Sequence, residues 1–177
     1  MSSVFDYRFT KLFTVLSILV SFIFASSVTG AHATVKSATA SASDQLLQCM
    51  SVKDASLNVV YLMDVSASWK FTDPTHKRAP MIASTLPMFA QLGSDIGRNV
   101  NYSFIQFGTS SDTKVVQSWM PLNLRNVSQQ SKRVLDWAKV ENSMGTDWEA
   151  GLNKARQQVQ IAKRGNSNAC FAMVWLT

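Results

Sequence analysis

Residues 57–68, LNVVYLMDVSAS, constrain the fold of this chain more than any other stretch. They begin as a run of apolar residues that favour β-structure, and the run ends abruptly at an acid, Asp64. Such a run is typical of a central strand in a parallel sheet, because helices cover both faces of that sheet. Ligands of open α/β sheets bind in the crevice at the carboxyl ends of these strands. The residues from Asp64 onward are therefore the first candidates for a functional site.

Three side chains with oxygen atoms follow at alternate positions: Asp64, Ser66 and Ser68. One is charged and two are neutral, a combination that suits a hydrophobic core poorly. A hard cation such as Mg²⁺ prefers oxygen ligands and keeps exchangeable positions. We therefore expect this turn to contribute ligands to a divalent cation.

The order Asp-x-Ser-x-Ser at the end of an apolar strand resembles the metal-ion-dependent adhesion site (MIDAS) of von Willebrand factor A (vWA) domains. That family adds a Thr from a later loop, and residues 145–152, GTDWEAGL, offer Thr146 for it. The resemblance covers roughly residues 57–177. It implies an α/β, Rossmann-like fold with a mostly parallel central sheet of order 3-2-1-4, flanked by helices, in which strand 3 is an antiparallel edge. It also implies one Mg²⁺ or Mn²⁺ held by Asp64, Ser66, Ser68 and Thr146.

Two residues beside these ligands leave alternatives open. Asp147 could orient the hydroxyls or bind the metal through water. It could equally belong to a helix N-terminus, where exposed N–H groups and the helix dipole favour acids, and Glu149 is open to the same interpretation. Ala67 stands where the family commonly has Gly, and the Cβ of Ala restricts the backbone before Ser68 more than Gly would.

The last residues, 169–177, form an apolar run without charge, which reads as an interior strand. In a sheet of order 3-2-1-4 this strand would lie at the edge, where long apolar strands are templates for aggregation. The vWA family typically continues here with Asp-Gly, whose Asp is a further ligand. We therefore expect residues 49–177 to be an incomplete vWA domain that lacks its last strands.

The amino-terminal residues, 1–33, read as a signal peptide. Two basic residues, Arg8 and Lys11, precede an uncharged apolar block over residues 12–25. That block is shorter than the ~20 residues of a spanning helix, so cleavage after Ala33, or as late as residue 40, is favoured over a retained signal anchor. Residues 34–48 read as a spacer, and the domain is expected to be secreted or at the cell surface.

The chain has two cysteines, Cys49 and Cys170. In an exported protein two cysteines favour a disulfide over two free thiols. If the two apolar runs are neighbouring parallel strands, their beginnings lie ~4.8 Å apart, which permits the bridge. Too few Cys and His residues remain for a zinc site.

Hydrophobic periodicity and turn signals place the other elements. Pro80 suits the first turn of a helix that runs towards Gly97, and Pro87 either kinks this helix or marks its real start. The remaining predicted elements are strands over residues 99–107 and 114–119 with a hairpin-like connection at 108–112, a helix from Ser128 to about Val140, and a helix from Asp147 to Lys163.

The net charge of +6 invites a nucleic-acid interpretation, but the basic residues are scattered and no aromatic residues interleave with them. The leading hypothesis is a non-enzymatic, metal-dependent binding module, similar to an adhesin or a receptor, whose protein or extracellular-matrix partner supplies a carboxylate. Membrane contact would come only from the leader or from an anchor beyond this sequence.

Two other functions stay open. An exported hydrolase could use Asp64 as nucleophile or metal ligand, although Ser66 stands where an Asp-nucleophile phosphatase needs a second acid and no Gly-x-Ser-x-Gly motif occurs. A metal-free structural subunit of a surface assembly would keep the fold, with the site lost because of Ala67.

Overall fold

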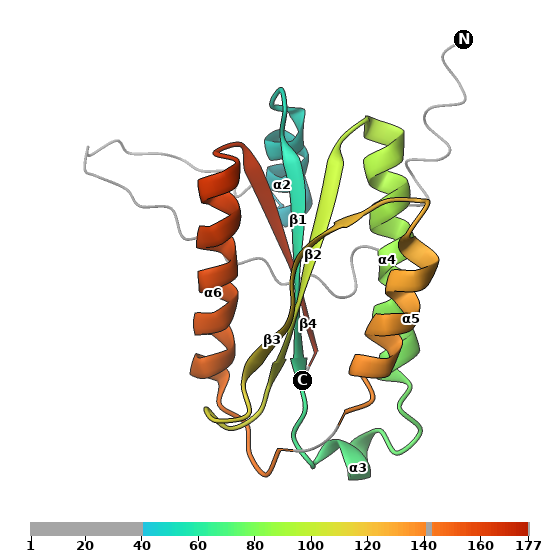
Figure 1. Ribbon diagram of the computed structural model, residues 1–177, viewed down its shortest axis with the longest axis vertical. Helices are drawn as coiled ribbons and strands as arrows, with labels where there is room; N and C mark the ends of the chain where they lie inside the picture. The colour runs from blue at the N-terminus through green and yellow to red at the C-terminus, as the bar shows by residue number, and fades with distance from the viewer. Residues whose placement is uncertain (1–40, 141–142, 177) are drawn as a thin grey trace, which may run out of the picture.

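The computed structural model describes residues 41–140 and 143–176, so the expected signal peptide lies outside the described residues. Helices and strands are interspersed along the described chain, as Figure 1 shows. In chain order they are α2 (Ala42–Ser51), β1 (Ser56–Asp64), α3 (Trp69–Thr72), α4 (Arg78–Ile96), β2 (Asn99–Phe107), β3 (Lys114–Leu122), α5 (Val127–Trp137), α6 (Trp148–Gly165) and β4 (Ala169–Leu176).

The four strands form one sheet of order β3-β2-β1-β4. Strand β1 runs parallel to β2 and to β4, and β3 pairs antiparallel with β2. The order and the antiparallel third strand confirm the prediction from the sequence. Every residue of β1 is buried, as expected for an apolar strand with helices on both sides.

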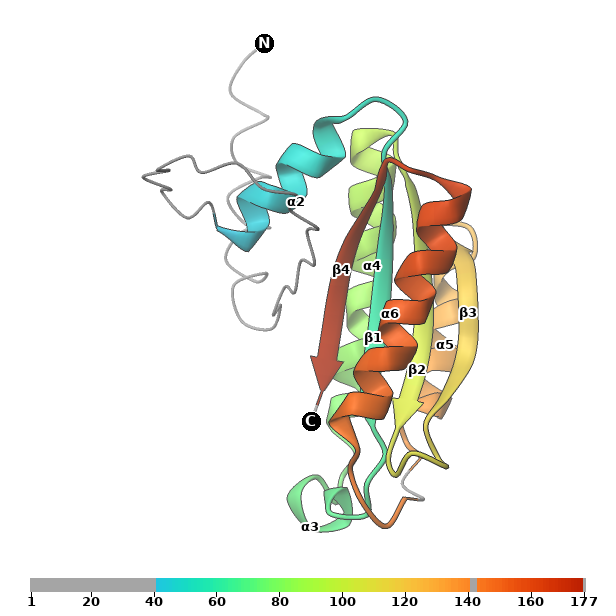
Figure 2. The same ribbon diagram turned by 90° about the vertical axis from the view of Figure 1, so that its left-hand side faces the viewer.

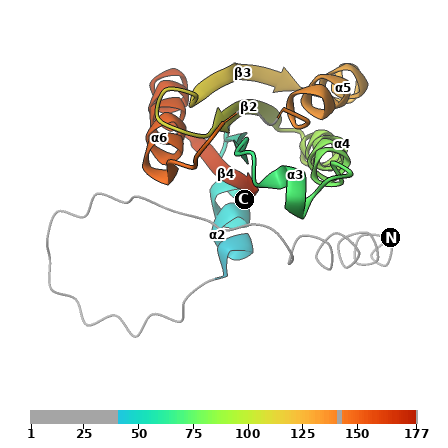
Figure 3. The same ribbon diagram turned by 90° about the horizontal axis from the view of Figure 1, so that it is seen from below.

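Helices cover both faces of the sheet. Figure 3 views the sheet from the carboxyl ends of its parallel strands, with α4 and α5 on one side and α6 on the other. The α4/α5 face carries large aromatic side chains, of which Tyr61 bonds to Thr85 on α4 and Tyr102 bonds to Gln130 on α5. The α6 face buries Val60, Leu62, Ile105 and Phe107 against Ala155. Alternate residues of each strand thus feed two separate cores.

A disulfide links α2 to β4. Cys49 and Cys170 are bonded with a Cα–Cα distance of 5.9 Å, which confirms the predicted pair. Figure 2 shows α2 beside β4 at the edge of the sheet. Residues 42–48, which we expected to belong to a spacer, are helical, and Leu46 and Met50 join the main hydrophobic core. Helix α2 is therefore part of the domain.

Three element boundaries differ from the sequence prediction. Helix α4 begins before Pro87 and continues through it, so Pro87 does not mark the real start. Helix α5 has Asn126 at its N-cap position instead of Ser128, and it ends at Trp137. Strand β3 extends to Leu122, beyond the predicted end at residue 119. Pairing with β2 explains this extension, because Leu122 faces Val100 in the ladder.

None of the helices in the described part of the chain is both long and apolar enough to cross a membrane. The Cys49–Cys170 disulfide is consistent with an oxidising, extracellular setting.

Candidate metal-binding site

The carboxyl end of β1 carries the first part of the predicted site. Asp64 is the last residue of the strand, and only 5% of its surface is exposed. Its Oδ1 accepts a hydrogen bond of 2.7 Å from the backbone N–H of Ser66. This bond is of the Asx-turn type, in which a carboxylate closes a tight turn over the next two residues. The other oxygen, Oδ2, makes no hydrogen bond with the residues described.

The two serines continue this turn. The Ser66 and Ser68 hydroxyl oxygens lie 2.8 Å apart and share a hydrogen bond. Ser66 is buried, whereas Ser68 is exposed at the N-cap position of α3. Hydrogen bonds therefore connect all three predicted ligands of the first motif, Asp64 through Ser66 to Ser68.

The loop between α5 and α6 reaches the same turn through its backbone. The N–H of Ser143 donates to the carbonyl of Val65 at 3.1 Å, and the N–H of Ala67 donates to the carbonyl of Ser143 at 2.8 Å. Together these bonds form an isolated parallel bridge between Ser66 and Ser143. The loop that carries Thr146 is thereby attached beside the first motif.

Thr146 lies three residues further along this loop and is exposed. Its hydroxyl makes no hydrogen bond with any described residue, and none joins it to Asp64 or to either serine. The loop that carries Thr146 is thus attached beside the turn after β1 through Ser143, and whether the Thr146 hydroxyl joins Asp64 and the serines around one cation stays a prediction.

Asp147 serves as the N-cap of α6. Its Oδ1 accepts a 2.9 Å hydrogen bond from the N–H of Ala150, and its own N–H donates to the carbonyl of Gly108. This is the helix N-terminus interpretation of Asp147, and Glu149 lies in the first turn of the same helix. Asp147 thus orients the start of α6 directly after Thr146.

The residue that links the loops at the carboxyl end of the parallel strands, Ser143, was not predicted from the sequence. Ser143 is fully buried, and its hydroxyl donates to Oδ2 of Asp112 at 2.7 Å while it accepts from the N–H of Thr109 at 2.8 Å. The Thr109 hydroxyl also donates to Asp112. Hydrogen bonds from Thr109, and then from Ser143, lower the pKa of the Asp112 carboxyl below its ordinary value. A buried polar group that is fully bonded fixes its neighbours, because any other arrangement would leave it unsatisfied.

Gly108 permits this close approach. A Cβ atom at this position would lie 2.1 Å from the Ser143 hydroxyl oxygen and 2.2 Å from the Ser143 Cβ. Only a residue without a side chain therefore lets the end of β2 meet the α5–α6 loop. In the sequence, Gly108 and Asp112 look like an ordinary hairpin turn, and nothing there links them to Ser143.

The segment after Ser68 is anchored by a second carboxylate. Asp73 accepts hydrogen bonds from the backbone N–H groups of Lys77 and Arg78, at 2.8 and 3.0 Å. The bond from the Arg78 N–H is the main reason that the pKa of Asp73 is lowered. The Arg78 guanidinium also stacks over the Trp69 ring, with its carbon 4.2 Å from the ring centroid. These contacts fix α3 against the start of α4.

The side chains at this edge fit a hard divalent cation. The predicted ligands, Asp64, Ser66, Ser68 and Thr146, offer one carboxylate and three neutral hydroxyl oxygens, the donor type that Mg²⁺ and Mn²⁺ select. Within residues 41–140 and 143–176, no three His, Cys, Asp or Glu side chains gather as a potential metal site. A cation at this place would therefore depend on Asp64 and on neutral oxygens, and the metal site stays a prediction.

No model of a known protein family matches this chain, and no curated protein is significantly similar to it. The resemblance to vWA domains therefore depends on the two motifs, and the sheet order is compatible with it.

Proposed function

We propose that this chain is an exported binding module of the vWA type, with no catalytic activity of its own. Asp64, Ser66, Ser68 and Thr146 would together hold one Mg²⁺ or Mn²⁺. The observation that supports this most is the bridge between Ser66 and Ser143. It attaches the loop that carries Thr146 to the turn after β1, although the two segments are far apart in the sequence.

Charge explains why such a site would bind an acidic partner. Asp64 supplies one negative charge, and the three hydroxyl ligands supply none, so a dication keeps a net positive charge. A carboxylate of the partner would neutralise this charge in a partly dehydrated site, where Coulomb attraction is stronger than in water. The partner class that follows is a protein or matrix ligand that presents an acidic side chain.

The compartment is consistent with such a role. The disulfide between Cys49 and Cys170 is of the kind that forms in oxidising compartments. An adhesion module would bind its partner outside the cell, which is such a compartment. Secretion or display at the cell surface, through the amino-terminal leader, is part of the proposal.

Metal titration tests the proposal. Saturating Mn²⁺ is expected to raise the free energy of unfolding of the wild type, by about 2.7 kcal/mol at a hundred times the dissociation constant. Asp64→Ala should abolish this gain. Asp136→Ala, which removes an exposed carboxylate on α5, is the matched control and should keep it. Equal stabilisation of the wild type and Asp64→Ala would show that the metal binds elsewhere.

The acidic partner can be tested with acetate as a minimal carboxylate. Acetate should lengthen the relaxation time of water protons in the presence of the bound Mn²⁺, because it displaces metal-bound water from the open position. The effect should be absent without the metal. A metal-free structural subunit would instead give no Mn²⁺-dependent stabilisation in the wild type.

A further inference from the structure

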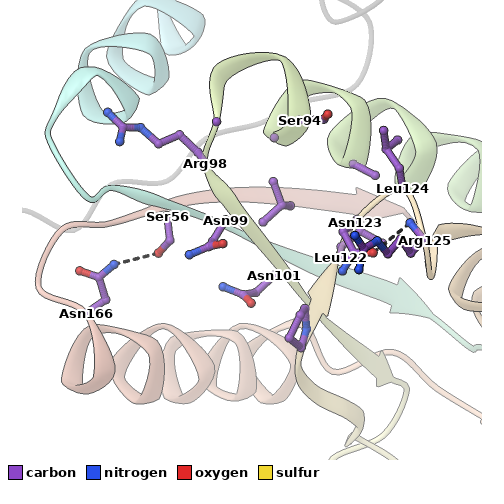
Figure 4. A pocket seen from close by; sticks show the side chains of 15 residues that line it. Ser56, Ser94, Arg98, Asn99, Asn101, Leu122, Asn123, Leu124, Arg125 and Asn166 are labelled. Carbon is purple, nitrogen blue, oxygen red and sulfur yellow. Dashed lines mark hydrogen bonds between the residues drawn. The ribbon is translucent and has the colours of Figure 1, made fainter.

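A cavity of about 880 Å³ lies at the opposite end of the sheet from Asp64. It is formed where β1 and β2 begin, where α4 and β3 end, and beside residue 166 after α6. Since β1 spans Ser56–Asp64, the two ends lie roughly 26 Å apart. Figure 4 shows the polar lining, which includes Ser56, Arg98, Asn99, Asn101, Arg125 and Asn166.

Two arginines stand at the ends of this cavity. In Figure 4, Arg98 and Arg125 lie on either side of Asn99 and Asn101. Neither guanidinium forms an ion pair or a hydrogen bond with the residues that the structure describes. A guanidinium pairs with a carboxylate or phosphate through two parallel N–H bonds, so two unpaired ones favour an anionic ligand.

The helix dipoles stabilise the charge of one arginine and destabilise the charge of the other. Arg98 follows the C-terminus of α4, where a positive charge is stabilised. Arg125 precedes the N-terminus of α5, where a positive charge is repelled, and no acid occupies the first turn of that helix. An anion beside Arg125 would relieve this repulsion. Arg125 is therefore the stronger evidence for a negatively charged ligand.

Hydrogen bonds hold two amide side chains of the lining, those of Asn101 and Asn166. Buried Asn58 accepts from Nδ2 of Asn101 at 3.1 Å and donates to the Ser56 hydroxyl at 3.1 Å. Nδ2 of Asn166 donates to the same hydroxyl at 3.1 Å. The Asn99 side chain makes no hydrogen bond with any residue in the described ranges. A row of positioned amides can donate to and accept from neighbouring hydroxyl groups.

The rest of the lining selects among anionic ligands. The exposed side chain of Leu124 and the ring of Pro121 supply apolar surface, and none of the described lining residues is aromatic. Without aromatic rings a nucleotide base has nothing to stack on. The volume falls within the range of about 300–1,000 Å³ that is usual for small-molecule sites.

We propose that this cavity binds a short acidic saccharide. The carboxylate of a uronic acid would pair with Arg125, and its hydroxyls would bond to Asn99 and Asn101. Its C–H faces would lie on Leu124, and Arg98 would donate to oxygen atoms at the other end of the saccharide. This site needs no metal, so it is independent of the metal-dependent function proposed for the residues around Asp64.

Isothermal titration with a matched pair of disaccharides tests the proposal. Cellobiouronic acid should bind the purified protein, and neutral cellobiose should bind at least about tenfold more weakly, because it lacks the charge that Arg125 recognises. Arg125→Gln and Arg98→Gln should each weaken binding of the acid by about tenfold. Arg156→Gln, an exposed arginine on α6 outside the cavity, should leave it unchanged.

Two further measurements keep the outcome unambiguous. Thermal unfolding of each variant, with Arg98→Lys and Arg125→Lys as charge-preserving substitutions, separates lost binding from lost folding. EDTA should not alter binding, since the cavity contains no proposed metal ligand. The proposal is overturned if both disaccharides bind equally, if neither binds, if Arg156→Gln loses binding as Arg125→Gln does, or if EDTA abolishes binding.

Discussion

The hydroxyl of Ser143 donates a 2.7 Å hydrogen bond to the carboxylate of Asp112, although the two residues are 31 positions apart in the chain. This bond joins the β2–β3 turn to the loop that precedes α6. Because the backbone of Ser143 also pairs with the turn after β1, one buried residue links three separate loops. The geometry of the candidate metal site follows from this arrangement.

Replacement of Asp112 by Asn should change how stability depends on pH. The pKa of Asp112 is lowered in the folded protein, mainly by the hydroxyl of Thr109 and then by that of Ser143. Its carboxylate therefore stabilises the fold above the unfolded pKa of about 4, and this contribution is lost as the pH falls through the folded pKa.

Urea unfolding between pH 2 and 7 measures this contribution. The difference between the wild type and Asp112→Asn should be largest near pH 6 and should shrink towards pH 2. Asp136→Asn, on the exposed side of α5, is the control and should show no such trend. A difference that does not vary with pH would mean that the charge of Asp112 does not matter.

Two glycines of α6 should respond oppositely to alanine. A Cβ on Gly151 would lie 2.9 Å from Cγ of Phe107, so Gly151→Ala should separate the helix from β2. Overpacking costs about 1–3 kcal/mol and outweighs the helix propensity gained. At Gly165 no heavy atom lies within 4 Å of such a Cβ, so Gly165→Ala should stabilise the protein by up to about 1 kcal/mol. Chemical denaturation measures the free energy of unfolding of both variants. Destabilisation by Gly165→Ala alone would contradict the packing of α6 described above.

Reduction of the disulfide should loosen α2 before it loosens the sheet. Cys49 and Cys170 are 121 positions apart, and loss of a bridge of this kind costs about 2–5 kcal/mol. Hydrogen exchange of residues 42–51 should accelerate in the reduced protein, while β1 keeps its protection. If α2 and β1 exchange at unchanged rates, the bridge contributes nothing to the attachment of the helix.

Asp147 should reveal its role through a pair of substitutions. Asp147→Asn keeps an oxygen that can accept the Ala150 N–H, so the free energy of unfolding should change by less than about 0.5 kcal/mol. Asp147→Ala removes the cap and should cost about 1 kcal/mol. Mn²⁺ titration of both variants then asks a separate question. Weaker metal binding by Asp147→Asn, at full stability, would add a metal-orienting role to the capping role.

The sheet could be predicted from the sequence because its signals are local and strong. The apolar run that ends at Asp64 identifies the central strand, and residues 99–107 alternate as a strand and form one. The disulfide could be predicted because the sequence contains two cysteines and its amino-terminal residues read as a signal peptide, which favours a bridge over free thiols. Helix α2 was missed because residues 34–43, rich in Ala, Ser and Thr, favoured a spacer there.

Only part of the candidate site could be predicted from the sequence. Asp64, Ser66 and Ser68 stand at and after the end of a recognisable strand, and hydrogen bonds join them in the fold. Their role as ligands of one cation stays a prediction. Ser143 and Asp112 have no signature, because a hydrogen bond between distant loops depends on the folded arrangement. Only the close contact that Gly108 allows makes their meeting possible.

The link from Cys49 to Cys170 also determines how mechanical load would pass through the domain. A pull on the chain ahead of α2 reaches Cys49 before it reaches β1, and there it divides between the backbone and the crosslink. One share enters β1 at Ser56, and the other enters the neighbouring strand at Cys170, beside Leu57. Both strands are then loaded from the same end, and the crosslink keeps the start of β1 beside the start of β4.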